Sequence, residues 1–160
     1  MELSRRHLII GGFSLGALAF ANVASASPKG NFPFKLSEAQ WRKRLSPTAF
    51  AVLRNEATER PGSSPLNKEK RKGTFSCAGC ALPVFSSTTK FESNTGWPSF
   101  WQALPKATGT SEDNSQFATR TEVHCARCGG HLGHVFDDGP KPTGKRYCMN
   151  GAALTFKAGA

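Results

Sequence analysis

The sequence of 160 residues lacks any apolar run as long as the ~20 residues that a membrane-spanning helix needs. Its main apolar stretch, residues 8–21, is shorter than that and is rich in Gly and Ala. After residue 26 the chain has no low-complexity tract and no internal repeat beyond a paired cysteine motif. These absences argue against a membrane-spanning or repeat architecture, and the length fits one ordinary domain.

Residues 1–26 have the features of an export signal. Arg5 and Arg6 stand directly before the apolar stretch, as in the twin-arginine signals of bacteria, and residues 24–26 form the small-residue cleavage site Ala-Ser-Ala. A retained membrane anchor is the alternative, but the short, glycine-rich run favours cleavage and no stable membrane insertion afterwards. We therefore expect export to the periplasm by the twin-arginine route. The expected parts are a signal peptide (1–26), a linker (27–34) and one folded domain (35–160).

Acidic side chains are scarce, with 11 Asp and Glu against 21 Lys and Arg and a formal net charge of +10. Such a positive net charge is typical of proteins that bind nucleic acid or anionic surfaces. The cations are spread along the chain or gathered in a loop at 68–72, which fits a solvated surface better than a docking patch. A basic zinc-ribbon module that stacks bases on Trp97, Phe100 and Trp101 is the alternative. That alternative leaves the lone thiol and the histidines described below unexplained, so we expect no nucleic-acid partner.

Helix signals are confined to a short segment near the start of the expected domain. Ser37 and Gln40 form a capping box for a helix to about Arg44, and Ser46 before a proline begins a second helix to about Arg54. The next residues, 55–72, are expected to be a loop. Aromatic and β-branched runs then alternate with Gly and Pro, at 74–76, 84–85, 116–123, 132–136, 146–150 and 154–156. Short strands at this spacing predict a mainly β, antiparallel domain with the two helices packed at its edge.

Four of the five cysteines form two Cys-x-x-Cys pairs, Cys77 with Cys80 and Cys125 with Cys128. Two such pairs in tight turns present four thiolates to one tetrahedral zinc ion. Two disulfides or a redox-active Cys-x-x-Cys are the alternatives in an exported protein, although neither pair opens a βαβ helix. A closed site of four thiolates leaves no ligand position for a substrate, so the expected zinc, one per chain, is structural.

The fifth cysteine, Cys148, stands alone on a short predicted strand between two glycines. Alternation along a strand places Arg146, Cys148 and Asn150 on one face and Tyr147 and Met149 on the other. A cation beside a thiol favours its thiolate form. A lone cysteine can also be a small buried hydrophobe, but the polar flanks on its own face favour a nucleophile.

Two histidines, His131 and His134, supply imidazoles near the lone thiol in the chain. A kink at Gly133 lets them converge, whereas a regular strand would point them to opposite faces; His134 and Phe136 share a face in either case. Each histidine can also be purely structural. The turn that contains Trp97 is rich in aromatic residues and offers an apolar wall for a methyl or thioether group.

These motifs together resemble the B-type peptide-methionine (R)-S-oxide reductases, from about residue 36 to residue 156. The shared motifs are Gly-Trp-Pro-Ser-Phe (96–100), Arg-Thr-Glu-Val (120–123), His-Leu-Gly-His-Val-Phe (131–136) with Asp-Gly-Pro (138–140), and Arg-Tyr-Cys-Met-Asn (146–150). The resemblance implies two antiparallel sheets with short flanking helices, stapled by the four-cysteine zinc site. It also implies reduction of methionine-R-sulfoxide, free or in oxidised proteins, as a repair reaction by a monomeric enzyme.

The same resemblance assigns roles to single residues. Cys148 is the nucleophile on the sulfoxide sulfur, and its product is a sulfenic acid, the first step of cysteine oxidation. Trp97 and Phe136 hold the ε-methyl group. The remaining residues implied to act at the site are His131, His134 and Asn150, which bind or protonate the sulfoxide oxygen, and Arg146, which lies beside the nucleophile.

The sequence departs from the family pattern at two places. Many members carry a second, resolving cysteine directly before the Gly-Trp pair, where this chain has Thr95. With the other thiols on zinc, we expect the sulfenic acid to be reduced by an external thioredoxin-like or small thiol. Release of a zinc-ligating cysteine to resolve it is the alternative. Gly62 stands where the family commonly has Phe, and there we expect only a local change in the loop.

Overall fold

The computed structural model describes residues 30–115 and 118–159. The predicted signal peptide and the start of the predicted linker lie outside these residues. Within them, no helix is both long and apolar enough to cross a membrane.

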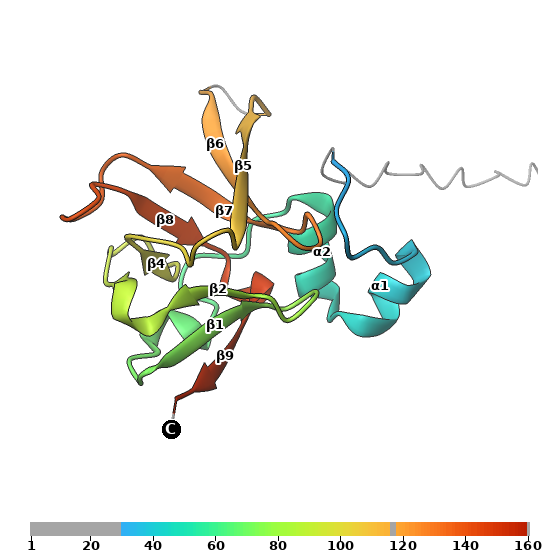
Figure 1. Cartoon of the computed structure of the whole chain (residues 1–160), viewed down its shortest axis with the longest axis horizontal. Helices are drawn as coiled ribbons and strands as arrows, with labels where there is room; N and C mark the ends of the chain where they lie inside the picture. Colours follow the sequence, from blue (N-terminus) through green and yellow to red (C-terminus); the bar gives the residue numbers. More distant parts are fainter. Residues whose placement is uncertain (1–29, 116–117, 160) are drawn as a thin grey trace, which may run out of the picture.

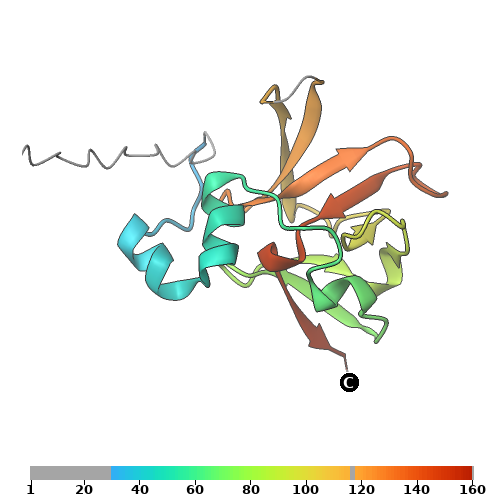
Figure 2. The same ribbon diagram turned by 180° about the vertical axis from the view of Figure 1, so that it is seen from behind.

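Both predicted helices are confirmed, with the predicted caps. Helix α1 (Glu38–Arg44) begins at Ser37, whose side chain accepts a hydrogen bond from Gln40 N while the Gln40 side chain accepts one from Ser37 N. Helix α2 (Pro47–Asn55) begins after Ser46, whose side chain accepts a hydrogen bond of 3.2 Å from Ala49 N. Both views show the two helices together on one side of the strands (Figure 1, Figure 2).

The strands form two antiparallel sheets, which confirms the predicted fold class. The smaller sheet has the order β2-β1-β9, from β2 (Pro83–Ser86), β1 (Gly73–Cys77) and β9 (Leu154–Ala158). The larger has the order β3-β4-β8-β7-β6-β5, from β3 (Lys90–Phe91), β4 (Ser99–Phe100), β8 (Arg146–Met149), β7 (His131–Phe136), β6 (Arg120–Cys125) and β5 (Thr108–Asp113). Short 3-10 turns lie at Pro65–Lys68, Ser87–Thr89 and Gly151–Ala153.

Stacked aromatic rings join the two sheets. Phe75 on β1, Phe85 on β2 and Phe100 on β4 are fully buried. The ring centroids of Phe85 and Phe100 are 4.4 Å apart, and those of Phe75 and Phe100 are 5.0 Å apart. Burial of each ring stabilises the fold by about 2 kcal/mol. This cluster fixes β4, which is the neighbour of the strand that carries Cys148.

Helix α2 covers the end of the larger sheet. It buries Phe50, Val52 and Leu53 and packs against β7 and the 3-10 turn that follows β8. The guanidinium of Arg42 lies 4.1 Å from the centre of the Phe50 ring. The segment after α2 therefore begins close to the strands that carry the predicted site.

Three strands were not predicted from the sequence, namely β3, β4 and β5. Strand β5 is polar and mostly exposed along its length, so it carries no alternating apolar pattern, and only its pairing with β6 makes it a strand. The strand predicted at 116–123 is β6, which begins at Arg120 and ends at Cys125. The first two of those predicted residues lie outside the described ranges.

The described part of the predicted linker, residues 30–34, is packed against the protein. Phe34 N donates a hydrogen bond of 3.0 Å to Arg127 O, and the Phe32 ring lies against His124, with centroids 5.6 Å apart. Phe34 also packs against Trp41 of α1. The linker thus contacts the turn that holds the second cysteine pair, and the domain boundary at residue 35 stays a prediction.

Candidate functional site

The four paired cysteines converge at one place, as the sequence predicts. All four sulfur atoms lie within 4.8 Å of one another and all four residues are buried. The nearest pairs are Cys77 with Cys128, at 3.7 Å, and Cys80 with Cys125, at 3.5 Å. These separations are far too long for a disulfide bond of about 2.05 Å. They match the roughly 3.8 Å between sulfurs that share a tetrahedral ion at about 2.3 Å.

The two Cys-x-x-Cys turns have the same backbone construction. Ala81 N donates to Cys77 O, and Gly129 N donates to Cys125 O, each at 2.8 Å. The residue after the second cysteine takes a positive φ in both turns, 60° for Ala81 and 65° for Gly129. The first turn joins β1 to β2 of the smaller sheet, and the second joins β6 to β7 of the larger. A metal bound here therefore ties the two sheets together.

The four thiols of the cysteine cluster interact chiefly with one another. The pKa of Cys77 is raised, chiefly by its hydrogen bond with Cys125, whereas the pKa of Cys125 is lowered, chiefly by its hydrogen bond with Cys128. Guanidinium groups of Arg44, Arg54 and Arg127 donate to backbone carbonyls of the two turns. The sulfurs are thus left facing one another, which suits a closed metal site.

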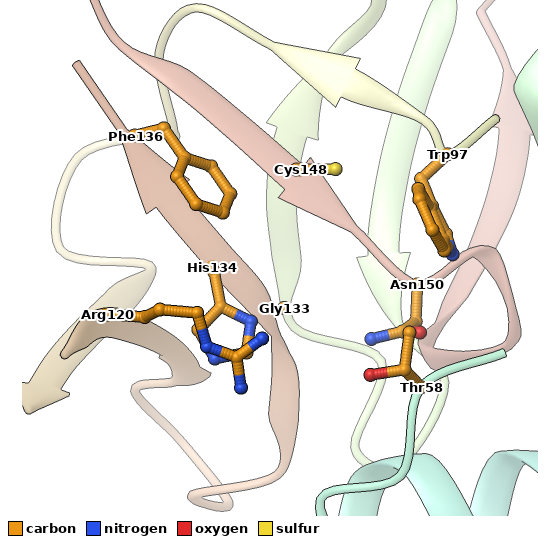
Figure 3. A pocket seen from close by; sticks show the side chains of 8 residues that line it. All are labelled: Thr58, Trp97, Arg120, Gly133, His134, Phe136, Cys148 and Asn150. Carbon is orange, nitrogen blue, oxygen red and sulfur yellow. The ribbon is translucent and has the colours of Figure 1, made fainter. Parts of the chain in front are cut away.

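A second, separate site surrounds Cys148. A cavity of about 110 Å³ opens beside its sulfur, large enough for a methylsulfinyl group. Figure 3 shows the sulfur between two walls, one of them with Phe136 and His134 and the other with Trp97. The lining residues are Thr58, Trp97, Arg120, Gly133, His134, Phe136, Cys148 and Asn150. Five of the seven catalytic and substrate-binding residues predicted from the sequence are among them.

Strand register places the Cys148 thiol inside the larger sheet. Cys148 on β8 pairs with His134 on β7 and with Ser99 on β4. It is half-buried, while its neighbour Met149 is completely buried. Gly133 permits the close approach of β7, because a Cβ atom there would overlap the carbonyl oxygen of Cys148.

His134 is oriented by a carboxylate on the edge strand. Its Nε2 lies 2.7 Å from Asp113 Oδ2, and Arg120 donates to the same oxygen at 2.6 Å. Desolvation acts to raise the pKa of Asp113, but hydrogen bonds from Ser115, His134 and Arg120 outweigh it and hold that pKa well below its usual range. Burial lowers the pKa of His134, and the hydrogen bond to Asp113 acts in the opposite direction. The hydrogen bond to Asp113 therefore fixes the orientation of the His134 ring, while burial disfavours its protonated form.

His131 lies on the same side of β7 as His134 but does not line the cavity. A register shift between Val123 and His124 lets both rings share a face, with centroids 5.3 Å apart. His131 is only 2% exposed, and its Nδ1 lies 2.9 Å from Glu122 Oε1. The predicted convergence of the two imidazoles is thus present, whereas a direct catalytic contact of His131 stays a prediction.

Glu122 is the anionic centre behind His131. Desolvation acts to raise its pKa, but hydrogen bonds with His124, His131 and Ser111 lower it well below the usual range. The Nε2 atom of His131 is buried and has no hydrogen-bond partner among the described residues. On its other side the His131 ring packs against the ring of His134.

Arg146 is not among the residues that line the cavity. It donates two hydrogen bonds of 2.8 Å to Asp138, and its guanidinium lies 4.4 Å from the centre of the Phe136 ring. The pKa of Arg146 is raised, first by Asp138 and to a smaller extent by the nearby Cys148 sulfur. Its predicted place beside the nucleophile is therefore observed, and it also holds Phe136 from outside.

Asn150 and Trp97 are fixed by a loop that folds back from α2. Glu59 N donates to Asn150 Oδ1 at 2.9 Å, and Trp97 Nε1 donates to Glu59 O at 3.2 Å. The Glu59 carboxylate, itself buried, accepts from Gly151 N and Ala152 N at the start of the 3-10 turn after β8. One loop thus positions two of the predicted site residues.

Four residues that shape the site were not identified from the sequence as site residues: Thr58, Arg120, Asp113 and Glu122. Two of them, Arg120 and Glu122, belong to the Arg-Thr-Glu-Val motif, and alternation would have placed them on one face of β6. Thr58 directly precedes Glu59, whose contacts become visible only in the fold. No sequence motif marks Asp113 as a site residue, because the pairing of β5 with β6 is what brings it next to Arg120.

Comparisons with known proteins agree with this geometry. The SelR domain family matches residues 45–158 of the chain. The chain is 54% identical over 122 residues to "Peptide methionine sulfoxide reductase MsrB" of Methanosarcina barkeri, covering 76% of this chain and 86% of that protein. It is 56% identical over 122 residues to the protein of the same name from Bradyrhizobium diazoefficiens, covering 76% and 88%. It is 44% identical over 158 residues to "Peptide methionine sulfoxide reductase B1, chloroplastic" of Arabidopsis thaliana, covering 96% and 77%.

Proposed function

Because this chain belongs to the MsrB family of peptide methionine sulfoxide reductases, we propose that its Cys148 pocket is the place where methionine-R-sulfoxide is reduced to methionine. The observation that carries this proposal is the half-buried Cys148 sulfur between an aromatic wall and the His134 imidazole. The reaction repairs methionine in oxidised proteins and also acts on the free amino acid.

The chemistry transfers one oxygen atom between two sulfurs. The Cys148 thiolate attacks the sulfoxide sulfur, and the sulfoxide oxygen moves to Cys148 together with one proton from a positioned acid. The substrate is thereby reduced to a thioether, and the thiol is oxidised to a sulfenic acid. Protonation of the departing oxygen is the step that needs a positioned acid.

His134 is suited to supply that proton. Its Nε2–H bonds to Asp113, and in the protonated imidazolium Nδ1 also carries a proton, which it can give to the sulfoxide oxygen. Asn150 has a second amide N–H beyond the one that donates to Leu132 O at 3.3 Å, and this N–H can bind the same oxygen. His131 acts through His134, as a positioning residue.

The choice of the R epimer comes from the aromatic walls. Trp97 and Phe136 stand on opposite sides of the sulfur in Figure 3, so they confine the ε-methyl group and leave the oxygen to the polar side. The test is turnover of separate R and S epimers of a blocked methionine sulfoxide. We expect rapid reduction of the R epimer and none of the S epimer, and equal rates would contradict the proposal.

The metal of the four-cysteine site is, in this proposal, a single structural zinc held by Cys77, Cys80, Cys125 and Cys128. The spacing of the sulfurs and the two matched turns support it. Zinc supplies folding energy here and leaves no position for substrate. Metal analysis with a thiol count should give one zinc and one reactive thiol per chain, whereas two disulfides by mass spectrometry would refute it.

Recycling of Cys148 uses an external thiol, either small or thioredoxin-like. Thr95 occupies the position of the usual resolving cysteine, and the four other thiols are buried in the metal cluster. One equivalent of substrate without reductant should leave a sulfenic acid that a dimedone reagent traps. A disulfide between Cys148 and a zinc ligand, with zinc released in step, would overturn this part of the proposal.

Export by the twin-arginine route, with cleavage after residue 26 and a monomeric periplasmic enzyme, completes the proposal. Its support is the Arg5-Arg6 pair, the short apolar run and the Ala-Ser-Ala site. N-terminal sequencing of the protein from a periplasmic extract should begin at Ser27. Retention of residues 1–26 in a membrane fraction would contradict it.

A further inference from the structure

Three hydroxyl side chains form a chain of hydrogen bonds that starts at the Cys148 sulfur. Thr95 Oγ1 lies 3.7 Å from Cys148 Sγ and 2.8 Å from Ser93 Oγ. Ser93 Oγ lies 2.7 Å from Ser99 Oγ, and Ser99 Oγ donates to Trp97 O at 3.2 Å. The nucleophile is thus joined through three hydroxyls to the backbone of the residue that forms the aromatic wall.

Such a chain can point in either direction, because each hydroxyl has one donor and two acceptor positions. When Cys148 is a thiol, the sulfur donates to Thr95, and successive O–H groups point along the chain to the Trp97 carbonyl. When Cys148 is a thiolate, Thr95 donates to the sulfur, Ser93 to Thr95 and Ser99 to Ser93. In this second arrangement every hydrogen bond of the chain is kept except the long one from Ser99 Oγ to Trp97 O.

The chain is held in place by the sheet. Ser99 is completely buried and is the direct partner of Cys148 in the β4–β8 register. Gly62 N donates to the carbonyl of Gly96 at 2.7 Å, which fixes the turn between Thr95 and β4. The hydroxyls therefore need little reorganisation when the charge on the sulfur changes.

The charged groups that face Cys148 come from the other side of the pocket and from its own strand. They are Arg146 on β8, His134 on β7 and Arg120 on β6, and each has a carboxylate partner, Asp138 for Arg146 and Asp113 for the other two. On the side of β4 the sulfur meets the hydroxyl chain. A thiolate at Cys148 therefore accepts a hydrogen bond from Thr95 Oγ1, on the side of β4.

We propose that Thr95 is a catalytic residue that donates a hydrogen bond to the Cys148 thiolate, with Ser93 and Ser99 as positioning residues that set its direction. The position that carries a resolving thiol in many relatives serves here to stabilise the nucleophile. The inference rests on the proposed function only in taking Cys148 as the nucleophile.

The test measures the thiolate directly in the zinc-loaded full chain. The rate of Cys148 alkylation by iodoacetamide is followed by peptide mass spectrometry across pH 6–10, in the wild type and in Thr95→Val, Thr95→Ser and Ser99→Ala. Hydrogen bonds to charged groups are strong enough that the Thr95→Val midpoint should move up by about one pH unit, a ~10-fold lower thiolate fraction. Thr95→Ser should restore the wild-type midpoint, and Ser99→Ala should give a smaller upward shift.

Thr121→Val, an exposed substitution on β6, is the matched control and should leave the profile unchanged. A Thr95→Val profile that superimposes on the wild type, or a Thr95→Ser profile as displaced as that of Thr95→Val, would overturn the inference. Failure of the proposed nucleophile is distinguished by turnover in Cys148→Ser. If that variant stays active the proposed function is at fault, and if it is inactive while the profiles coincide only the hydroxyl chain is at fault.

Discussion

The five cysteines of this protein lie in two regions whose surroundings differ. Four are buried in two turns and face only one another, whereas Cys148 is half-buried in the middle of a strand and faces a cavity. The turns bring sulfur atoms together from distant parts of the chain. The strand keeps one sulfur apart and gives it partners of other kinds. Four thiols close together form a candidate metal site, whereas a single thiol with other polar neighbours is suited to be a nucleophile. The buried cluster is closed to substrate, and the half-buried thiol is open to it.

Strand β7 connects the two regions. It begins directly after the second cysteine turn and carries Gly133, His134 and Phe136 to the pocket. The metal site and the active site therefore share a rigid element, although no cysteine of one region belongs to the other. Loss of the metal should disturb the pocket through β7, whereas changes in the pocket should leave the metal in place.

The largest effect on activity is expected from Cys148→Ser. Serine is a far weaker nucleophile toward sulfur, so kcat/KM should fall by more than about 10³-fold. The melting temperature and the zinc content should stay close to those of the wild type, because the substitution is nearly isosteric. Steady-state kinetics and differential scanning calorimetry measure both. A parallel loss of stability would show that the two regions are not independent.

The largest effect on stability is expected from Cys125→Ser. A site with three thiolates loses a large share of the ~10–16 kcal/mol that structural zinc binding supplies, so the protein should be metal-poor and prone to aggregate. Activity should fall at least as far as the folded fraction, because loss of the metal also disturbs the pocket through β7. Metal analysis and thermal unfolding provide the measurement, and a stable, active, zinc-free variant would be incompatible with the division into two regions.

Asp113→Asn tests the acid in the pocket without touching the metal. Asp113 stabilises the protonated His134 imidazole, so its removal should lower the His134 pKa still further below its ordinary value. The alkaline limb of the kcat/KM profile should then move to lower pH, and activity at pH 7 should fall by roughly 10–100-fold. Glu112→Gln, on the same strand but exposed, is the control and should leave the profile unaltered. An unchanged profile for Asp113→Asn would exclude His134 as the acid.

The two regions also differ in how far the sequence alone predicts them. The convergence of the four cysteines was predictable, since a metal site of four thiolates needs those residue types at that spacing; zinc as the metal stays a prediction. In the pocket, Cys148, His134, Trp97 and Phe136 were predicted from strand alternation and family resemblance. Asp113 was not, because a polar edge strand has no periodic signal and its pairing is set by a distant strand. His131 was expected at the sulfoxide; its ring packs against His134 but does not line the cavity, and its contact with the substrate stays a prediction.

The smallest predicted effect compares the two cysteine turns with each other. Ala81 and Gly129 occupy the same position after the second cysteine, with φ of 60° and 65°. A positive φ costs a non-glycine residue about 1–2 kcal/mol, and the greater freedom of glycine in the unfolded chain offsets part of this. Because Ala81 is exposed, Ala81→Gly should raise the free energy of unfolding by about 0.5–1 kcal/mol.

The reciprocal change, Gly129→Ala, should do the opposite and more strongly. It adds the same backbone strain, and its Cβ would overlap the ring of Phe32 in the packed linker. We expect a loss of about 1–3 kcal/mol in urea unfolding of the zinc-loaded protein, with kcat/KM unchanged in both variants. The two turns are joined by the hydrogen bond from Arg127 to Cys80 O, in which neither Ala81 nor Gly129 takes part, so the combination of the two substitutions should be close to additive. Equal and small effects of both variants would mean that bound zinc, and not the backbone of each turn, determines the geometry at this position.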